Sequence, residues 1–267
     1  MEYCFETVNW SPYFGFAAPD VPAMIRAAAS HGYSSISLDM PTIEHYCATG
    51  GSLSGLRAEL DKAGVKLLAL HSLAVSADLD EVDRLTRPLV AACTALGAEY
   101  LHAGVTAPVD HAVIVATRHA GQMCSDSGIG FAIEFLPFLP VASIQQTRDL
   151  LSSAGLSKKG LVIDTWHFFN GPDDWAELES VGADEIAYVQ FNDHAPLASG
   201  ADVLFETTQR RLLPGEGAFD LKRFAATLRA AGFDGVVGPE ILSEESRRFS
   251  MDEAARRIME TSGPYWV

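Results

Sequence analysis

The chain has 267 residues, of which 48% are hydrophobic and 20% are charged, enough apolar side chains for one large α/β domain. Its formal net charge is −16 at pH 7, which argues against binding nucleic acid or an anionic membrane, since both require clustered lysine and arginine. No apolar run approaches the roughly 20 residues that span a bilayer. The first residues lack the basic head of a signal peptide.

Cysteine usage indicates the compartment. Cys4, Cys47, Cys93 and Cys124 are widely scattered and form no CxxC pair. This pattern favours reduced, buried thiols in a cytoplasmic protein over a disulfide framework or a zinc site.

Taken in order, apolar runs and helix-capping residues predict strands that alternate with helices. The elements expected in the first half are a strand at Tyr3–Val8, a helix from the cap Asp20 through His31, a strand at Ser34–Leu38, a helix at Ser54–Ala63, a strand at Lys66–Leu70, a helix at Asp80–Leu96, a strand at Glu99–Ala103 and a helix at Asp110–Ser127. Those expected in the second half are a strand at Ile129–Phe135, a helix at Ser143–Ala154, a strand from Leu161 to Asp164, a helix at Asp173–Val181, a strand at Ile186–Phe191, a long loop to Phe219, a helix at Asp220–Ala231, a strand at Gly235–Glu240 and a helix at Ser250–Thr261.

Eight strands alternating with helices, in units of about 30 residues, fit a (β/α)₈ TIM barrel that forms a single domain over residues 1–267. A doubly wound open sheet is the alternative fold. Such a sheet usually begins with a glycine-rich phosphate loop after its first strand. Here that position is occupied by Asn9-Trp10-Ser11-Pro12-Tyr13, so the barrel is favoured.

Polar residues recur where strands three to eight end. They are His71, His102, Glu134, Asp164, Gln190 and Glu240. Active-site groups of such barrels lie at these strand ends, and strand alternation predicts that the three carboxylates and the carboxamide point to one spot. Three anions in a dry pocket need a counter-charge, which one divalent cation would supply. Four oxygen ligands suit Mg²⁺ or Mn²⁺ better than Zn²⁺.

Each of these residues also has a plainer interpretation. Asp164 could pair with Arg211, and Glu240 could cap the loop that follows it. His71 and His102 could be ordinary polar residues at strand ends. The metal hypothesis therefore depends on all four oxygen ligands being in equivalent positions, because short motifs have many false positives.

Most of the chain, and its second half most strongly, resembles the xylose-isomerase-like TIM-barrel superfamily. That superfamily includes sugar-phosphate isomerase/epimerase-like proteins, ketose 3-epimerases, inosose-processing enzymes and 3-dehydroshikimate dehydratases. The segments that carry the resemblance are Phe131-Ala132-Ile133-Glu134, Val162-Ile163-Asp164-Thr165-Trp166-His167, Tyr188-Val189-Gln190-Phe191-Asn192-Asp193, Arg211-Leu212-Leu213-Pro214-Gly215-Glu216-Gly217 and Gly235-Val236-Val237-Gly238-Pro239-Glu240. The resemblance implies that Glu134, Asp164, Gln190 and Glu240 hold one divalent metal ion. It also implies that His167 and Arg211 contact substrate oxygens.

Gln190 departs from many members, including the ketose 3-epimerases, which carry histidine there, and looks more like some 3-dehydroshikimate dehydratases. Against that substrate, the stretch 135–140 is apolar and lacks polar residues to bind a carboxylate. Trp10, Tyr13, Phe14 and Trp166 also suggest a pocket with hydrophobic walls.

The resulting prediction is a metal-dependent isomerase or epimerase that removes a proton beside the carbonyl of a sugar-like or cyclic polyhydroxy ketone. Glu134 and Glu240 would exchange the proton on opposite faces, and His167 would polarise a substrate oxygen. Arg211 would stabilise the enediolate. The substrate contacts expected besides Arg211 are His71, His102 and Trp166.

Other functions stay open. If the β-hydroxyl leaves, the same site is a dehydratase of the 3-dehydroshikimate or inosose type. An apurinic-site endonuclease is disfavoured by Gln190 and by the acidic charge, and a non-catalytic sugar-binding subunit by the intact ligand set. A homo-oligomer is expected by analogy, and the aromatic tail 263–267 could pack on the barrel or on a neighbouring subunit.

Two further motifs have plain interpretations. Pro214-Gly215-Glu216-Gly217 could bind phosphate through its amides, but a tight turn that positions Arg211 is the favoured prediction. His194 lies four residues beyond Gln190, in the expected loop, and is ranked below it as a ligand.

Overall fold

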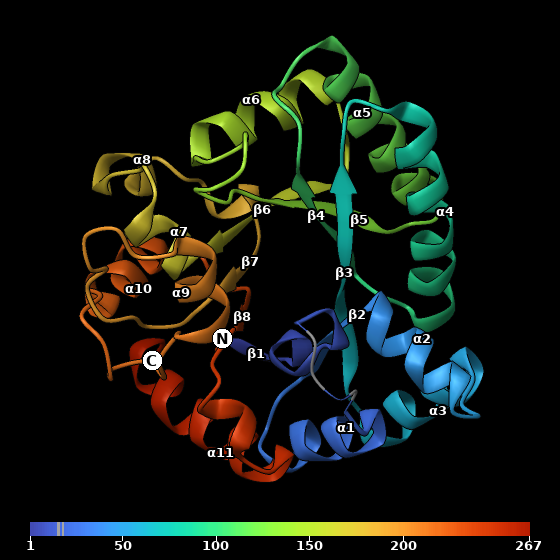
Figure 1. Cartoon of the computed structure of the whole chain (residues 1–267), viewed down its shortest axis with the longest axis vertical. Helices are drawn as coiled ribbons and strands as arrows, with labels where there is room; N and C mark the ends of the chain where they lie inside the picture. The colour runs from blue at the N-terminus through green and yellow to red at the C-terminus, as the bar shows by residue number, and fades with distance from the viewer. Residues whose placement is uncertain (15–16, 18) are drawn as a thin grey trace.

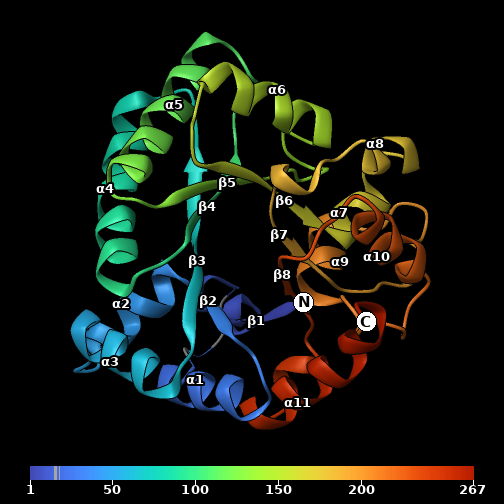
Figure 2. The same cartoon turned by 180° about the vertical axis from the view of Figure 1, so that it is seen from behind.

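The protein is a closed barrel of parallel strands surrounded by helices (Figures 1 and 2). Its computed structural model describes residues 1–14, 17 and 19–267. The strands pair in sequence order, β1 with β2 and onward, and β8 closes the ring by pairing with β1. The predicted TIM barrel is therefore confirmed, and the open-sheet alternative is wrong.

The described residues form eight strands. They are β1 (Glu2–Glu6), β2 (Ser35–Asp39), β3 (Lys66–Val75), β4 (Tyr100–Val105), β5 (Gly130–Glu134), β6 (Lys159–Asp164), β7 (Ile186–Gln190) and β8 (Val236–Gly238).

The α-helices follow the strands along the chain and form the outer ring. They are α1 (Val21–Ser30), α2 (Met40–Ala48), α3 (Leu53–Ala63), α4 (Leu79–Leu96), α5 (His111–Asp126), α6 (Ile144–Ala154), α7 (Thr165–Asn170), α8 (Trp175–Glu179), α9 (Val203–Gln209), α10 (Leu221–Ala230) and α11 (Met251–Ser262). In both views α11 lies beside α1, where the ring of helices closes. None of the helices among the described residues has the length and apolar character to cross a bilayer.

Aspartate or serine side chains begin most of these helices by accepting a backbone N–H of the first turn. Asp20 accepts from Ala23 before α1, and Ser143 accepts from Gln146 before α6. Each cap satisfies a backbone donor that has no partner within its own helix, at a gain of about 1 kcal/mol. These caps explain why the predicted starts of the longer helices agree with the structure to within one or two residues.

The core has two layers, as both faces of a parallel barrel strand are buried. A small cluster of inward-facing side chains fills the barrel, and it includes Cys4, Leu68, Ala132, Val162 and Tyr188. A larger apolar layer separates the strands from the helices. The polar residues at the strand ends thus lie above a closely packed layer of side chains inside the barrel.

Three helices were not predicted: α2, α7 and α9. β3 also extends to Val75 instead of ending before His71. α9 lies inside the stretch that was predicted to be a long loop to Phe219. α2 and α7 begin directly after β2 and β6, and all three helices are nine residues or shorter, so they show little of the 3.6-residue periodicity on which the prediction depended.

Candidate functional site

The candidate site lies at the carboxyl ends of β5 to β8. Glu134 is the last residue of β5, Asp164 of β6 and Gln190 of β7, and Glu240 follows β8 by two residues. All four side chains are buried. The expected position of these residues at one end of the barrel is therefore confirmed, while their role as metal ligands stays a prediction.

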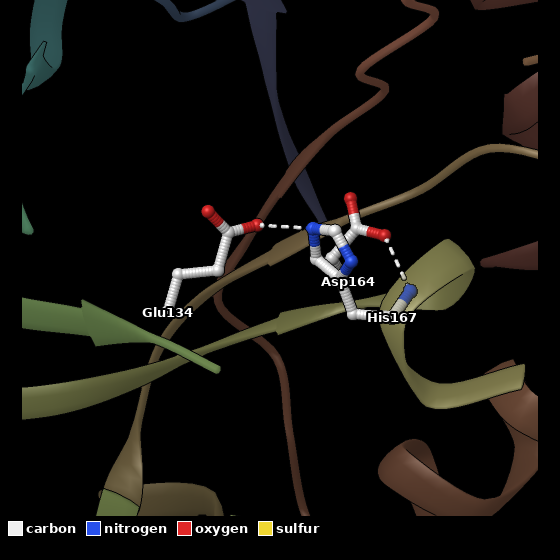
Figure 3. A group of neighbouring side chains, drawn as sticks. All are labelled: Glu134, Asp164 and His167. Atoms are coloured by element: carbon white, nitrogen blue, oxygen red, sulfur yellow. Dashed lines mark hydrogen bonds and ion pairs between the residues drawn. The ribbon is translucent and has the colours of Figure 1, made fainter. Parts of the chain in front are cut away.

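The junction of β6 and α7 places Asp164 and His167 together. α7 begins directly after the strand, and Asp164 is its N-cap, accepting the backbone N–H of His167 at 3.1 Å (Figure 3). The cap fixes the backbone of His167 and leaves its ring free to point at Glu134. A sharp strand-to-helix turn thus delivers a carboxylate and an imidazole to the same place.

Glu134 lies between two histidines. Its Oε2 is 3.0 Å from His102 Nε2. Its Oε1 is 3.2 Å from His167 Nε2, the contact drawn in Figure 3. The contact with His167 lacks the alignment of a hydrogen bond, so the described part of the chain leaves Oε1 buried without a hydrogen-bond partner. Burial by itself would raise the pKa of Glu134, but the two histidines outweigh it and hold that pKa well below its usual range.

Arg211 joins the other two carboxylates. Its Nη1 donates to Asp164 Oδ2 and to Glu240 Oε2, at 2.8 Å each, and its side chain is only 2% exposed. Gln190 Nε2 donates to Glu240 Oε1 at 2.6 Å, which leaves Gln190 Oε1 buried without a partner among the described residues. Burial raises the pKa of Glu240 to about 8, with Arg211 opposing the shift and neighbouring carboxylates adding to it.

The plainer interpretation of Asp164, an ion pair with Arg211, is therefore what the structure shows. Arg211 is fixed from behind by α9, because Nε donates to the Thr207 carbonyl at 2.8 Å and Nη2 donates to Thr207 Oγ1 at 2.9 Å. Asn192 Nδ2 donates to Asp164 Oδ2 at 3.1 Å. Thr207 was not among the expected site residues, because α9 was expected to be a loop, and Asn192 was given no role although it belongs to the Gln190 motif.

His71 and His102 form a second layer next to Glu134. Their ring centres lie 4.3 Å apart, and His71 Nε2 is 3.4 Å from Glu6 Oε2. Burial works against charge on His71, but the adjacent Glu6 outweighs it and raises the pKa of His71. Burial and His71 together lower the pKa of His102. Glu6 was missed as a site residue, although a charge in a short apolar strand was the signal that could have found it.

The aromatic residues do not all line the site as expected. Trp166 is fully buried, with its ring centre 5.4 Å from that of His167 and 6.0 Å from the Arg211 guanidinium carbon. It supports those two side chains from behind, and its expected contact with substrate stays a prediction. Trp10 is also buried, against Phe5, whereas Tyr13 is 74% exposed.

The turn at 214–217 is not a phosphate site. Its Gly215 N–H donates to Asp193 Oδ2 at 3.0 Å, so a buried carboxylate already occupies the position that an anion would need. A Cβ on Gly217 would lie 2.3 Å from Asp193 Oδ1, which explains why glycine is needed there. His194 contacts Glu206 at 3.1 Å through Nε2, away from Gln190. The predicted tight turn is confirmed, but its contact is with Asp193, whereas Arg211 is held by Thr207.

The residues at the site fit a bound cation. Ligand atoms of Glu134, Asp164 and His167 lie within 4.8 Å of one another. Two further observations support the fit, namely the buried and unpartnered Oε1 atoms of Glu134 and Gln190. Oxygen donors together with one imidazole suit Mg²⁺, Mn²⁺ or Zn²⁺.

Residues 25–261 match the family described as xylose isomerase-like TIM barrels. The chain belongs to this family. Among curated relatives, the inosose isomerase of Bacillus velezensis is 24% identical over 254 residues, which cover 89% of each chain. The 3-dehydroshikimate dehydratase of Pseudomonas aeruginosa is 24% identical over 85% of this chain and 37% of that protein.

Solved structures agree on the fold. The IOLI protein with a bound zinc atom superposes with a TM-score of 0.85 at 20% identity, covering 100% of this chain and 98% of that one. The curated relatives are isomerases and dehydratases, which supports an enzyme of this family and leaves the particular reaction open.

Proposed function

We propose that the protein is a divalent-metal-dependent isomerase or epimerase that removes a proton beside the carbonyl of an uncharged polyhydroxy ketone. The observation that carries the proposal is Glu134 Oε1, a carboxylate oxygen that is buried, has no hydrogen-bond partner among the described residues and lies 3.2 Å from His167 Nε2. The lowered pKa keeps Glu134 ionised, and an ionised carboxylate held next to the substrate can act as a general base toward a C–H bond. The likeness to inosose isomerases supports the same reaction class.

In this scheme Glu134 takes the proton, and Glu240 returns one from the opposite side of the substrate. His167 donates a hydrogen bond to the substrate oxygen that becomes negative, and its position is fixed by the Asp164 cap. Arg211 balances the charge of Asp164 and Glu240 while the enediolate exists.

Glu134, Asp164, Gln190 and Glu240 would hold the metal ion. When bound, the ion would polarise the carbonyl and so acidify the neighbouring C–H bond. The ligand oxygens favour Mg²⁺ or Mn²⁺, whereas the likeness to a zinc-bound structure makes Zn²⁺ a metal to test beside them.

The charge balance of the site favours an uncharged substrate. Arg211 is the one buried lysine or arginine among the described residues, and it is already bonded to two carboxylates. Glu6 and Glu134 are buried nearby and add further negative charge. A carboxylate or phosphate group on the substrate would be repelled unless the metal ion compensated for it.

A dehydratase is the second candidate. Gln190 at the third ligand position and the match to 3-dehydroshikimate dehydratases favour it. Proton abstraction by Glu134 would be shared with the isomerase, and the reaction would differ only in loss of the β-hydroxyl.

The test is a screen in D₂O with Mn²⁺, Mg²⁺ or Zn²⁺, using inososes, ketohexoses and 3-dehydroshikimate, read by NMR. We expect deuterium to enter beside the carbonyl of an uncharged ketone. Loss of water from 3-dehydroshikimate would replace the first candidate by the second. An absence of both reactions with every metal would contradict the proposal and favour a non-catalytic binding protein.

Variants identify the acid and the base. We expect Glu134→Gln and Glu240→Gln each to slow exchange about 10²- to 10⁴-fold, the usual contribution of a positioned acid or base. Glu185→Gln is the matched control, because Glu185 precedes β7 at the other end of the barrel. Near-normal exchange in either site variant would rule out the two-carboxylate scheme. The homo-oligomer and the cytoplasmic location stay predictions.

A further inference from the structure

Tyr188 lies one layer below the candidate site. It is on β7, two residues before Gln190, so both side chains point into the barrel. Tyr188 is fully buried and packs in the inner cluster with Cys4 and Val162. From this position it cannot reach a substrate above the strand ends, yet its hydroxyl has a polar partner.

That partner is His102. Tyr188 Oη lies 2.6 Å from His102 Nδ1, and His102 Nε2 lies 3.0 Å from Glu134 Oε2. A carboxylate can only accept, so Nε2 carries the proton in this contact. In the neutral ring Nδ1 is then a lone-pair acceptor, and the tyrosine O–H donates to it. The three side chains form one directed chain: Tyr188 O–H to His102, and His102 N–H to Glu134.

The chain acts on one oxygen of Glu134 only. With Oε2 engaged by His102, the carboxylate is held in the rotation that turns Oε1 toward His167. The packing of the His71 ring against the His102 ring, with the two planes tilted by 46°, would restrict the His102 ring but would not distinguish it from its flipped form. Hydrogen bonds at both ring nitrogens of His102 distinguish the two ring orientations, because flipping the ring would break both bonds.

We propose that Tyr188 is a positioning residue that, through His102, orients Glu134 so that Oε1 is available for proton transfer. The consequence for catalysis rests on the proposed function, whereas the orientation itself does not. Such supporting hydrogen bonds typically change metal affinity or activity by 10- to 100-fold when removed.

The first test is ¹⁵N NMR of the histidine rings in the metal-free protein, with His102 assigned by the signal that His102→Gln removes. In the wild type we expect Nε2–H and a hydrogen-bonded, unprotonated Nδ1. Tyr188→Phe should move the Nδ1 signal toward the position of a free lone-pair nitrogen. Tyr100→Phe is the matched control, because it removes a tyrosine hydroxyl on β4 whose ring centre lies 6.2 Å from that of Tyr188.

A protonated Nδ1 in the wild type, or an unchanged signal in Tyr188→Phe, would overturn the proposal. Circular dichroism and the thermal midpoint show whether each variant folds. If Tyr188→Phe fails to fold, the protonation state of His102 Nδ1 in the wild type decides alone.

The second test is a double-mutant cycle on the dissociation constant for Mn²⁺. We expect Tyr188→Phe to weaken Mn²⁺ binding about 10-fold in the wild type and to have almost no further effect in the His102→Gln background. Equal effects in both backgrounds would mean that Tyr188 does not act through His102, and the proposal would be wrong. If the wild type binds none of Mn²⁺, Mg²⁺ and Zn²⁺, the metal in the proposed function is wrong, and the NMR result still tests the role of Tyr188.

Discussion

Arg211 decides how the charge at the site is balanced. The convergence of several carboxylates predicted a dication, but Arg211 already neutralises part of that charge through Asp164 and Glu240. Glu134 and Glu6 are outside its reach and remain buried beside histidines. The electrostatic need for a metal is therefore weaker than the sequence implied, and the unpartnered oxygens of Glu134 and Gln190 carry more of the argument.

The first prediction concerns Arg211→Met in metal-free buffer. Removing one partner of a buried ion pair leaves uncompensated charge, so we expect the free energy of unfolding to fall by about 3 to 5 kcal/mol. Urea denaturation followed by circular dichroism measures this. Because the carboxylates lose their competitor, Mn²⁺ should stabilise the variant more than the wild type.

Arg210→Met is the control, since the Arg210 side chain is 63% exposed and we expect a change within about 0.5 kcal/mol. If Mn²⁺ stabilised Arg211→Met less than the wild type, Arg211 would not compete with the metal. The carboxylates would then have to be neutralised in another way.

The second prediction concerns the four thiols. Cys4, Cys93 and Cys124 are buried, and burial raises the pKa of Cys93 and of Cys124 to about 12. Cys47 on α2 is partly exposed. We expect a thiol reagent such as DTNB to modify one thiol rapidly in the native protein and four in denaturant, because only an accessible thiolate reacts. Cys47→Ser should remove the rapid phase, and fast reaction of a second thiol would show that a buried one becomes accessible.

At the scale of elements, the strand order and the longer helices could be predicted from the sequence, because strand alternation and capping residues are local signals. The positions of Glu134, Asp164, Gln190 and Glu240 could also be predicted, since a barrel brings all strand ends together. The ion pair of Asp164 with Arg211 was one of the interpretations that the sequence left open, and the structure shows it. Other contacts around the site could not be predicted, because they join distant parts of the chain, as Tyr188 reaches His102 across 86 residues of sequence.

The short helices show the same limit. α7 has six residues, and its sequence reads as a continuation of the apolar strand before it. Only the cap made by Asp164 turns the chain into a helix, and a carboxylate there also suits a metal ligand or an ion pair. Asp164 was therefore compatible with a helix cap, a metal ligand or an ion pair, and the local sequence did not distinguish between these roles.

The third prediction concerns the ion pair that links α6 to the start of β7. Arg148 donates to Glu185 at 2.7 and 2.9 Å, and these hydrogen bonds lower the pKa of Glu185 from its usual 4.5. A lowered pKa stabilises the fold above the unfolded-state value, and this stabilisation is lost as pH falls through the folded-state pKa. Arg148→Met should therefore lower the thermal midpoint at pH 7 and reduce its fall between pH 5 and pH 3.

The loss at pH 7 should stay below about 1 kcal/mol from the charge pair, because the Glu185 side chain is 38% exposed and solvent screens it. Arg223→Met removes a more exposed ion pair and serves as the control. An unchanged acid slope in Arg148→Met would show that Glu185 titrates alike in the folded and unfolded states.

At the scale of the whole molecule, barrel closure is the weakest part of the strand ring. β8 has three residues and is in register with β1 and with β7 through two residue pairs each. The aromatic tail compensates for this. Trp266 is 3% exposed, and its ring centre lies 5.2 Å from that of Phe191 after β7 and 6.2 Å from that of Phe233 before β8. The packing of the tail on its own barrel is confirmed.

The last prediction is that Trp266→Ala lowers the free energy of unfolding by about 3 to 5 kcal/mol, the usual result of removing a buried aromatic side chain. Because Trp266 packs against the residue that follows β7 and against the segment that precedes β8, amide exchange should speed up in β8 and its neighbours β7 and β1 more than in β4 and β5. Deletion of Val267, which is 86% exposed, is the control and should change stability little. Uniform acceleration across all strands would mean that the ring opens as one unit, and that the tail stabilises the whole barrel instead of its closing strand.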